Sequence, residues 1–230
     1  MLVIPIFLSA AFLFSASGIP ATNPEPAPEV SLPAVVSCDV LIDAGHGGID
    51  GGTYSDGILE KDINLAVARR LYHVLADRNY RAVLNRDDDY ALSEENRWSS
   101  SKSRHQRDLS QRQQLSETIR PKIMISIHAN WSKNPRVRGP IVLFQRQYHS
   151  FLLADMIQQS LNHVFSTSER PVAGRTYYLL NRTKVPTVIV ETGFLSNSDD
   201  RAKLANPDEQ QKIAEALARA IDAYFHLIRM

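Results

Sequence analysis

The chain has 230 residues, of which 43% are hydrophobic and 22% charged, so it is long enough for one ordinary globular domain with a substantial core. Its 26 lysines and arginines almost balance its 25 aspartates and glutamates, which excludes a global basic field and predicts no nucleic-acid partner. Basic residues gather between Arg97 and Arg120, where we expect a solvated face or loop. Cys38 is the single cysteine, which excludes an intramolecular disulfide and suggests a small buried residue at the start of a strand.

The N-terminal segment is typical of export. The apolar run Leu2 to Phe14 is followed by small residues, so we expect residues 1–18 to be a signal peptide or an uncleaved N-terminal anchor to a membrane. Residues 19–36 contain five prolines and predict a semi-rigid linker. The folded part, residues 37–230, is therefore expected on the extracytoplasmic side.

Strand and helix patterns alternate from residue 37 onward. This alternation predicts one α/β domain with a mostly parallel central sheet flanked by helices on both faces. The expected strands span residues 39–43, 80–85, 123–127, 140–144, 177–180 and 187–190. The expected helices span residues 61–78, 109–119, 151–164 and 207–228, and residues 87–103 are expected to form a loop.

Chemically active side chains follow three of the expected strands. His46 lies in a glycine-rich turn after the first strand, His128 ends a second strand, and Glu191 ends a third. Glu60 lies in the first turn of the helix that follows His46. Ligands collect at the carboxyl edge of open α/β sheets, so these groups predict one site. Two histidines and one carboxylate are the ligand set of a catalytic zinc ion, and the remaining glutamate could then act as general base.

Each of these residues also has a plainer interpretation. The glycine loop could be structural or could bind phosphate, although no Gly-Lys-Ser/Thr follows it. Glu60 could simply stabilise a helix N-terminus, and His128 could be a satisfied core histidine. Glu191 is harder to explain in this way, because a carboxylate beside a buried sheet needs a cation, a metal or a proton.

Four segments carry a resemblance to a known family. They are Ile42-Asp-Ala-Gly-His-Gly-Gly-Ile-Asp-Gly-Gly52, Gly57-Ile-Leu-Glu-Lys-Asp-Ile-Asn-Leu65, Ile125-Ser-Ile-His-Ala-Asn130 and Val190-Glu-Thr-Gly-Phe-Leu-Ser-Asn197. In order and spacing they resemble the zinc-dependent N-acetylmuramoyl-L-alanine amidases, and the chain is most similar to the spore-cortex (germination-specific) members. The resemblance implies hydrolysis of the amide bond between the lactyl group of N-acetylmuramic acid and L-alanine of the peptidoglycan stem peptide.

The resemblance also implies the site residues. One Zn²⁺ per chain would be bound by His46, Glu60 and His128, and Glu191 would be the catalytic carboxylate. Four further residues would support a metal ligand or contact the substrate: Asp43, Asn130, Arg86 and Arg112. Of these, Asp43 or Asn130 is expected to orient an imidazole, whereas each arginine could equally pair with loop acids.

Three alternatives stay open at this stage. A zinc peptidase acting on the stem peptide would need the same ligands, and a catalytically silent wall-binding module would need none of them. A cytosolic phosphate-binding protein fits poorly with the export-like N-terminus.

The run Trp131 to Arg138 is too short for the helical plug that some family members carry after the equivalent strand. We therefore expect an open zinc cleft, restrained from outside the domain, for example by a separate regulatory protein.

Overall fold

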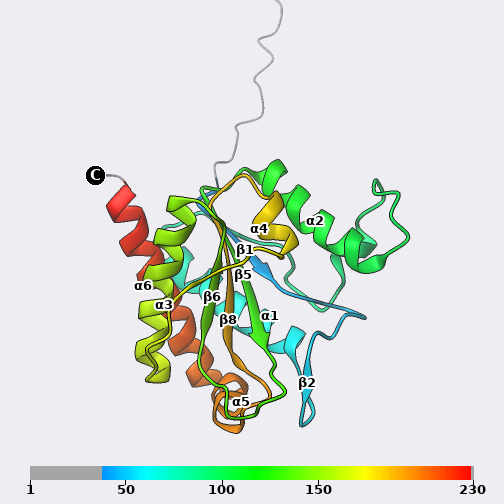
Figure 1. Cartoon of the computed structure of the whole chain (residues 1–230). Coiled ribbons are helices and arrows are strands. Elements are labelled where there is room, and N and C mark those ends of the chain that lie inside the picture. The colour runs from blue at the N-terminus through cyan, green and yellow to red at the C-terminus, as the bar shows by residue number, and fades with distance from the viewer. Residues whose placement is uncertain (1–37, 229–230) are drawn as a thin grey trace, which may run out of the picture. The chain divides into compact units, whose positions relative to one another are not determined.

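A six-stranded sheet forms the centre of the protein, as the computed structural model of residues 38–228 shows (Figure 1). Its strand order is β4-β1-β5-β8-β6-β7, with bounds β1 Val40–Ala44, β4 Ala82–Leu84, β5 Ile123–Asn130, β6 Ile141–Phe144, β7 Val172–Ala173 and β8 Thr187–Phe194. Strands β4, β1, β5 and β8 are parallel, whereas β6 is antiparallel to β8. The mostly parallel sheet is confirmed. The predicted signal or anchor and the proline-rich linker lie outside the described residues.

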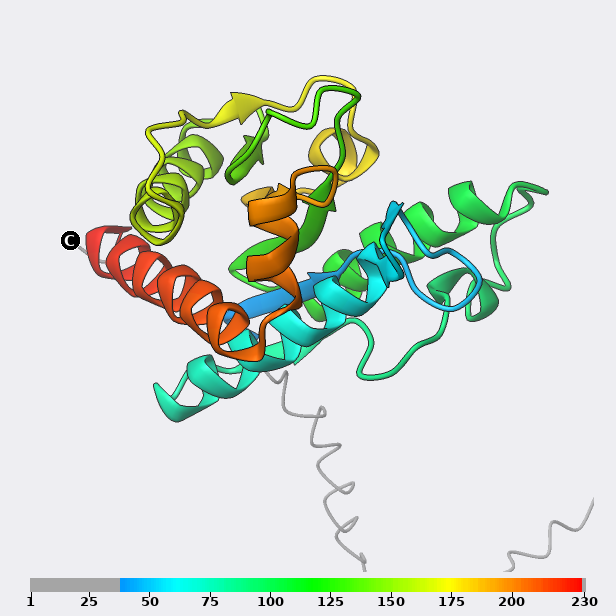
Figure 2. The same cartoon turned by 90° about the horizontal axis from the view of Figure 1, so that it is seen from below.

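Helices cover both faces of this sheet (Figure 2). The larger core lies beneath α1 Glu60–Asp77, α3 Tyr148–Phe165 and α6 Pro207–Ile228. The opposite face is covered by α2 Arg104–Ile119 and the short α4 Tyr178–Arg182. Successive side chains of β1 alternate between the two faces of the sheet. Val40 and Ile42 enter the larger core, and Leu41 packs on the face that α2 covers. Because both faces are covered, the central strands are continuous apolar runs.

Smaller elements complete the fold. They are the hairpin of β2 Tyr54–Ser55 and β3 Ile58–Leu59, the 3₁₀ turn η1 Leu92–Glu94, and α5 Ser198–Ala205. Cys38 is buried two residues before β1, which confirms the predicted burial. Within residues 38–228, none of the helices combines the length and the apolar character needed to cross a membrane.

The structure corrects the sequence-based assignment at three points. Residues 177–180 were predicted as a strand, but Tyr177 is the N-cap of helix α4 and residues 178–180 form its start, because a short apolar run is compatible with either structure. Helix α2 begins at Arg104 rather than Leu109, since the hydroxyl of Ser103 accepts a hydrogen bond from the backbone N–H of Gln106 and caps it. The β2–β3 hairpin, β7 and α5 were not predicted. The helix over residues 207–228 is confirmed with the same bounds.

Candidate metal centre

Three strands deliver the predicted residues to one edge of the sheet. Strands β1, β5 and β8 are parallel neighbours, so their carboxyl ends meet there. His46 follows β1, and His128 of β5 lies opposite Glu191 of β8 in the strand register. The register shifts between His128 and Asn130, a β-bulge of the kind often found beside active sites. Glu60 is the first residue of α1, which packs against this edge.

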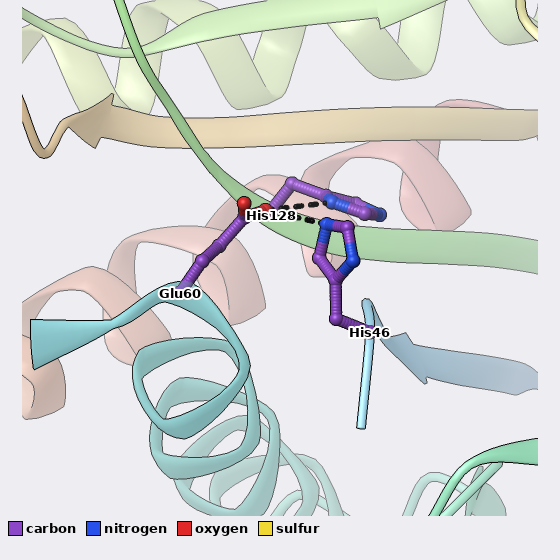
Figure 3. A group of neighbouring side chains, drawn as sticks. All are labelled: His46, Glu60 and His128. Atoms are coloured by element: carbon purple, nitrogen blue, oxygen red, sulfur yellow. Dashed lines mark hydrogen bonds and ion pairs between the residues drawn. The ribbon is translucent and has the colours of Figure 1, made fainter. Parts of the chain in front are cut away.

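Two histidines converge on one carboxylate oxygen (Figure 3). The Oε1 atom of Glu60 lies 3.2 Å from Nε2 of His46 and 2.9 Å from Nδ1 of His128. The three potential ligand atoms all lie within 4.8 Å of one another, and within residues 38–228 this is the one group of His, Cys, Asp or Glu that could hold a metal in this way. Ligand atoms around a tetrahedral zinc ion lie roughly 3.4 Å apart. The residues therefore fit a metal ion bound by nitrogen and oxygen.

The charges of this cluster favour a cation at its centre. Burial alone would raise the pKa of Glu60, but hydrogen bonds from His128 and His46 hold that pKa well below its usual range. Burial alone would lower the pKa of His46, but the carboxylates of Asp50 and Glu60 raise it to about 9. Without a metal, a proton on His46 therefore supplies the positive charge that the buried carboxylate requires. A divalent cation would supply the same charge.

Backbone groups fix the carboxylate of Glu60. The N–H of Thr53 donates to Oε2 at 2.8 Å, and the N–H of Ala129 donates to Oε1 at 3.2 Å. The side-chain amide of Asn64 also donates to Oε1, at 3.4 Å. The side chain of Glu60 is only 4% exposed, so the carboxylate is held in place before any ligand arrives. This preorganisation is typical of a functional site.

Glu191 is buried beside the cluster, and its carboxylate has no hydrogen-bonding partner among residues 38–228. Glu191 as a whole is 8% exposed to solvent. Burial is the main cause that raises the pKa of its carboxyl group to about 7; the charge of Glu60 adds to this increase, and His128 and His46 oppose it. Its carboxylate is not one of the three converging ligands. A carboxylate with a pKa near neutrality at the edge of a metal site has the properties of a general base.

Two buried arginines hold the backbone that carries His46. Arg112 donates from Nη1 to the carbonyl of Ala44 and from Nη2 to the carbonyl of His46, both at 2.9 Å. Arg86 donates from Nε to Ala44 at 3.1 Å and from Nη2 to Gly45 at 3.0 Å. The two guanidinium groups thus bind three consecutive carbonyls, and His46 adopts a left-handed backbone conformation with φ of 59°. Neither arginine lines the cavity above the cluster.

The structure corrects the prediction that Asp43 or Asn130 orients an imidazole. The carboxylate of Asp43 accepts hydrogen bonds from Arg112 and Asn85, at 2.6 and 2.5 Å, and from the hydroxyl of Ser126. Asp43 follows Leu41 and Ile42 along β1, and strand alternation turns its side chain toward α2 and away from the histidines. Asn130 accepts a hydrogen bond from the backbone N–H of the next residue, at 2.7 Å.

The carboxylate beside an imidazole is instead Asp50, which the sequence analysis missed. Its Oδ2 lies 2.9 Å from Nδ1 of His46. The two residues are four positions apart in the glycine-rich loop, and that spacing was the signal that could have revealed the contact. Nε2 of the same ring faces Glu60.

An open cavity of about 580 Å³ lies over the cluster. Besides the three converging residues and Glu191, its lining residues come from β5 and the residue after it, from α2, from α4 and the segment before it, from β8 and from the loop before β2: Ala129, Asn130, Trp131, His105, Leu109, Thr176, Tyr177, Tyr178, Leu179, Ile189 and Thr53. Trp131 is 47% exposed and Tyr177 is 41% exposed, so both aromatic rings are available to a ligand. An extended polymer could therefore reach the buried carboxylates from solvent.

A mostly parallel α/β sheet with a His–Glu–His cluster and a buried carboxylate at its carboxyl edge defines a hydrolase of the kind that binds a metal ion. The sequence profile of the N-acetylmuramoyl-L-alanine amidase family (Amidase_3) matches residues 40–223. The chain belongs to this family, and it is an enzyme of the class that hydrolyses the peptidoglycan of the cell wall.

Individual relatives agree with this assignment. The chain is 36% identical over 189 residues to the uncharacterized protein YqiI of Bacillus subtilis, covering 81% of this chain and 84% of that protein. It is 30% identical over 188 residues to the germination-specific N-acetylmuramoyl-L-alanine amidase of the same organism, covering 81% and 79%. The amidase LytC is 31% identical, but the matched region spans only 39% of its length.

Solved structures share the fold. The CwlD amidase of Clostridioides difficile, solved in complex with the GerS lipoprotein, superposes with a TM-score of 0.77 at 30% identity, covering 83% of this chain and 100% of that chain. The amidase AmiC2 of Nostoc punctiforme gives a TM-score of 0.69 at 29% identity, covering 82% and 97%. The resemblance inferred from the four sequence segments is confirmed.

Proposed function

We propose that this protein is a zinc-dependent amidase that cleaves the bond between the lactyl group of N-acetylmuramic acid and L-alanine of the stem peptide. The observation that carries the proposal is the convergence of His46, Glu60 and His128 next to the unpaired carboxylate of Glu191. These three residues would hold one zinc ion, because two imidazole nitrogens and a carboxylate leave a coordination position open to water or substrate.

The protein's own groups suit each proton transfer of an amide hydrolysis. A zinc ion held here would lower the pKa of a water molecule and polarise the scissile carbonyl. Glu191, with its pKa near neutrality, would take a proton from the attacking water. The same carboxyl group would then give that proton to the nitrogen of the departing alanine. Glu60 is fully engaged with backbone N–H groups and histidines, so it would not compete for this proton.

The cavity walls suggest how the substrate is held. Trp131 follows β5 directly and Tyr177 precedes α4, and both line the cavity that contains Glu191. Aromatic rings bind the apolar faces of sugars and side chains while they remain partly in water. We infer that these two rings contact the polymer on either side of the scissile amide and so bind a glycan-linked peptide.

Two rival functions make different predictions. A peptidase would cut within the stem peptide, and only its products would distinguish it. A silent wall-binding module would need none of the buried, oriented carboxylates of Glu60 and Glu191. The burial of Glu191, whose carboxylate has no partner among residues 38–228, favours catalysis, because burying an unpaired carboxylate is costly and perturbed carboxyl groups cluster at functional sites.

The setting is proposed from the N-terminus and the relatives. We infer export through residues 1–18, with residues 19–36 as a linker, so the enzyme would act on the extracytoplasmic side. Similarity to a germination-specific amidase supports action on spore cortex, where removal of stem peptides would allow muramic δ-lactam to form. The CwlD neighbour was solved with a lipoprotein, which supports a separate regulatory protein for this chain as well.

Product analysis tests the proposal. Purified zinc-loaded protein is incubated with peptidoglycan, and the products are identified by mass spectrometry. The proposal predicts peptides that begin with free L-alanine and muramic acid that keeps its lactyl carboxylate. Products cut between two amino acids would establish a peptidase. Tight binding without any product, from protein that carries zinc, would establish a wall-binding module.

A further inference from the structure

We propose that Asp50 is the positioning residue of the metal centre: its carboxylate holds the His46 imidazole so that Nε2 faces Glu60 and the metal. The inference rests on the proposed zinc site and adds a residue to it. It assigns the two nitrogens of His46 different functions, because Nδ1 would carry the proton and Nε2 would donate its lone pair.

The imidazole of His46 lies between two carboxylates. Nδ1 is 2.9 Å from Oδ2 of Asp50, and Nε2 is 3.2 Å from Oε1 of Glu60. The Nδ1 contact has the distance of an ion pair without full hydrogen-bond alignment. A histidine that binds a metal through one nitrogen commonly donates the other N–H to a carboxylate, which fixes the tautomer and the direction of the ring. Asp50 stands where that carboxylate is needed.

The loop is built to keep Asp50 in this place. Residues Gly47 and Asp50 exchange two backbone hydrogen bonds, N–H of each to C=O of the other, at 2.9 and 3.0 Å. The N–H of Gly52 donates to Oδ1 of Asp50 at 3.2 Å, which leaves Oδ2 for His46. Hydrogen bonds within the short turn therefore place the carboxylate of Asp50 beside the ring of His46.

Glycines allow this loop to approach the site. A Cβ atom at Gly52, where φ is 66°, would lie 2.5 Å from Oε2 of Glu60 and 2.7 Å from Cδ2 of His46. A Cβ atom at Gly47 would lie 2.2 Å from the carbonyl oxygen of Tyr90. Only a loop without side chains at these positions can bring Asp50 to the outer nitrogen of the ring.

The two imidazoles are held in different ways. The His128 ring packs on Gly45, since a Cβ atom at Gly45 would lie 2.3 Å from its Cε1. The side chain of His46 is 22% exposed and meets His128 only edge to face, with ring centroids 5.0 Å apart. The two rings are nonetheless similarly enclosed, since the side chain of His128 is 21% exposed and His46 also lies against a glycine, Gly52. What distinguishes His46 is a second carboxylate, that of Asp50, at the ring nitrogen that faces away from Glu60, and this contact would fix the rotation of the ring about χ2.

Zinc affinity of the full chain tests the inference directly. Asp50→Ala and Asp50→Asn are compared with wild type by competition against a chromophoric zinc chelator. We expect affinity about 10–100-fold weaker for Asp50→Ala, with a smaller loss for Asp50→Asn, which can still accept a hydrogen bond. The matched control is Asp89→Asn, because Asp89 accepts a hydrogen bond from Gly48 N–H of the same loop, at 2.7 Å, and does not contact His46. That control should bind zinc within about threefold of wild type.

The ring nitrogens provide a second measurement that needs no Asp50 variant. Nitrogen-15 NMR of zinc-loaded wild type, with His46 assigned by the resonance lost in His46→Gln, should show a protonated Nδ1 and a metal-bound Nε2. A metal-bound Nδ1, or Asp50→Ala with wild-type zinc affinity, would overturn the inference. If wild type itself binds no zinc, the proposed function fails instead, so the two failures are distinguishable.

Discussion

At the scale of single residues, the site depends on buried charges whose partners are fixed by the backbone. Glu60 is surrounded by donors, whereas Glu191 has none within residues 38–228. This difference separates a ligand, which must stay ionised, from a base, which must exchange a proton. Environments that push the pKa values of two neighbouring carboxyl groups apart are typical of acid–base catalysis.

The first prediction concerns the role of Glu191 in substrate turnover. Glu191→Gln preserves the size of the side chain but removes the ability to take the proton of water. We expect kcat to fall about 10²–10⁴-fold while the bound zinc, measured by atomic absorption, stays at the wild-type level. A variant that keeps more than about a tenth of the wild-type kcat would show that another group is the base.

The second prediction concerns the pH dependence of stability in the metal-free protein. The pKa of Glu191 rises from an ordinary 4.5 to about 7 on folding. Well below pH 4.5 the carboxyl group of Glu191 is neutral in both the folded and the unfolded state. As the pH rises from 4.5 to 7 the unfolded state ionises first, so the free energy of unfolding falls. Above pH 7 the whole loss of stability remains. Glu191→Gln should therefore be more stable than wild type by about 1–3 kcal/mol near pH 8 and no more stable near pH 4. Denaturant unfolding at both pH values measures this, and an equal difference at both would contradict it.

The third prediction concerns Arg112. Its guanidinium group is 3% exposed and pairs with Asp43 at 2.6 Å and with Asp108 at 2.5 Å. Arg112→Met leaves both carboxylates buried without their cation, so we expect a loss of about 3–5 kcal/mol in the free energy of unfolding. Lys184→Met is the control, because Lys184 is 81% exposed where it pairs with Glu117 and its loss should have little effect. An equal effect of the two substitutions would refute the structural importance of the buried pair.

At the scale of secondary-structure elements, the sequence predicts which residues come together at the site better than it predicts the contacts and elements around them. His46, His128 and Glu191 follow from strand ends alone, because parallel strands bring their carboxyl ends together. The partners of Asp43 were not predicted, because Arg112 and Asn85 are distant from it in the sequence. The contact of Asp50 with His46 was indicated only by their spacing, and it depends on the left-handed conformation of His46. Residues 177–180 were misassigned because their apolar run is too short to reveal a period. The antiparallel direction of β6 likewise depends on sheet contacts that sequence patterns do not encode.

The fourth prediction concerns the end of β5. Trp131 lines the cavity with 47% exposure, so Trp131→Ala should raise KM for peptidoglycan several-fold and change kcat little. Trp98→Ala is the matched control: Trp98 is 57% exposed but does not line that cavity, and its loss should leave KM unchanged. A fall in kcat without a change in KM would mean that Trp131 does not bind substrate.

At the scale of the whole molecule, the fold presents its site to solvent. No helix or strand interrupts the connection between β5 and β6 in the part of the chain described, and the cavity over Glu191 is open. Both observations agree with the sequence-based prediction of an open cleft, and restraint of the enzyme from outside the catalytic domain stays a prediction. The polymer that the family cleaves is large, so an exposed edge of the sheet suits it better than an enclosed pocket.

The most direct test of this account is the turnover of peptidoglycan by one preparation before and after metal removal. The protein is stripped with a chelator, dialysed, and assayed alone and with one equivalent of Zn²⁺. We predict no stem-peptide release from the stripped protein and recovery of activity with zinc, because His46, Glu60 and His128 would supply all the protein ligands. His128→Ala should neither retain zinc nor recover activity. Undiminished release by fully stripped wild-type protein would contradict the account.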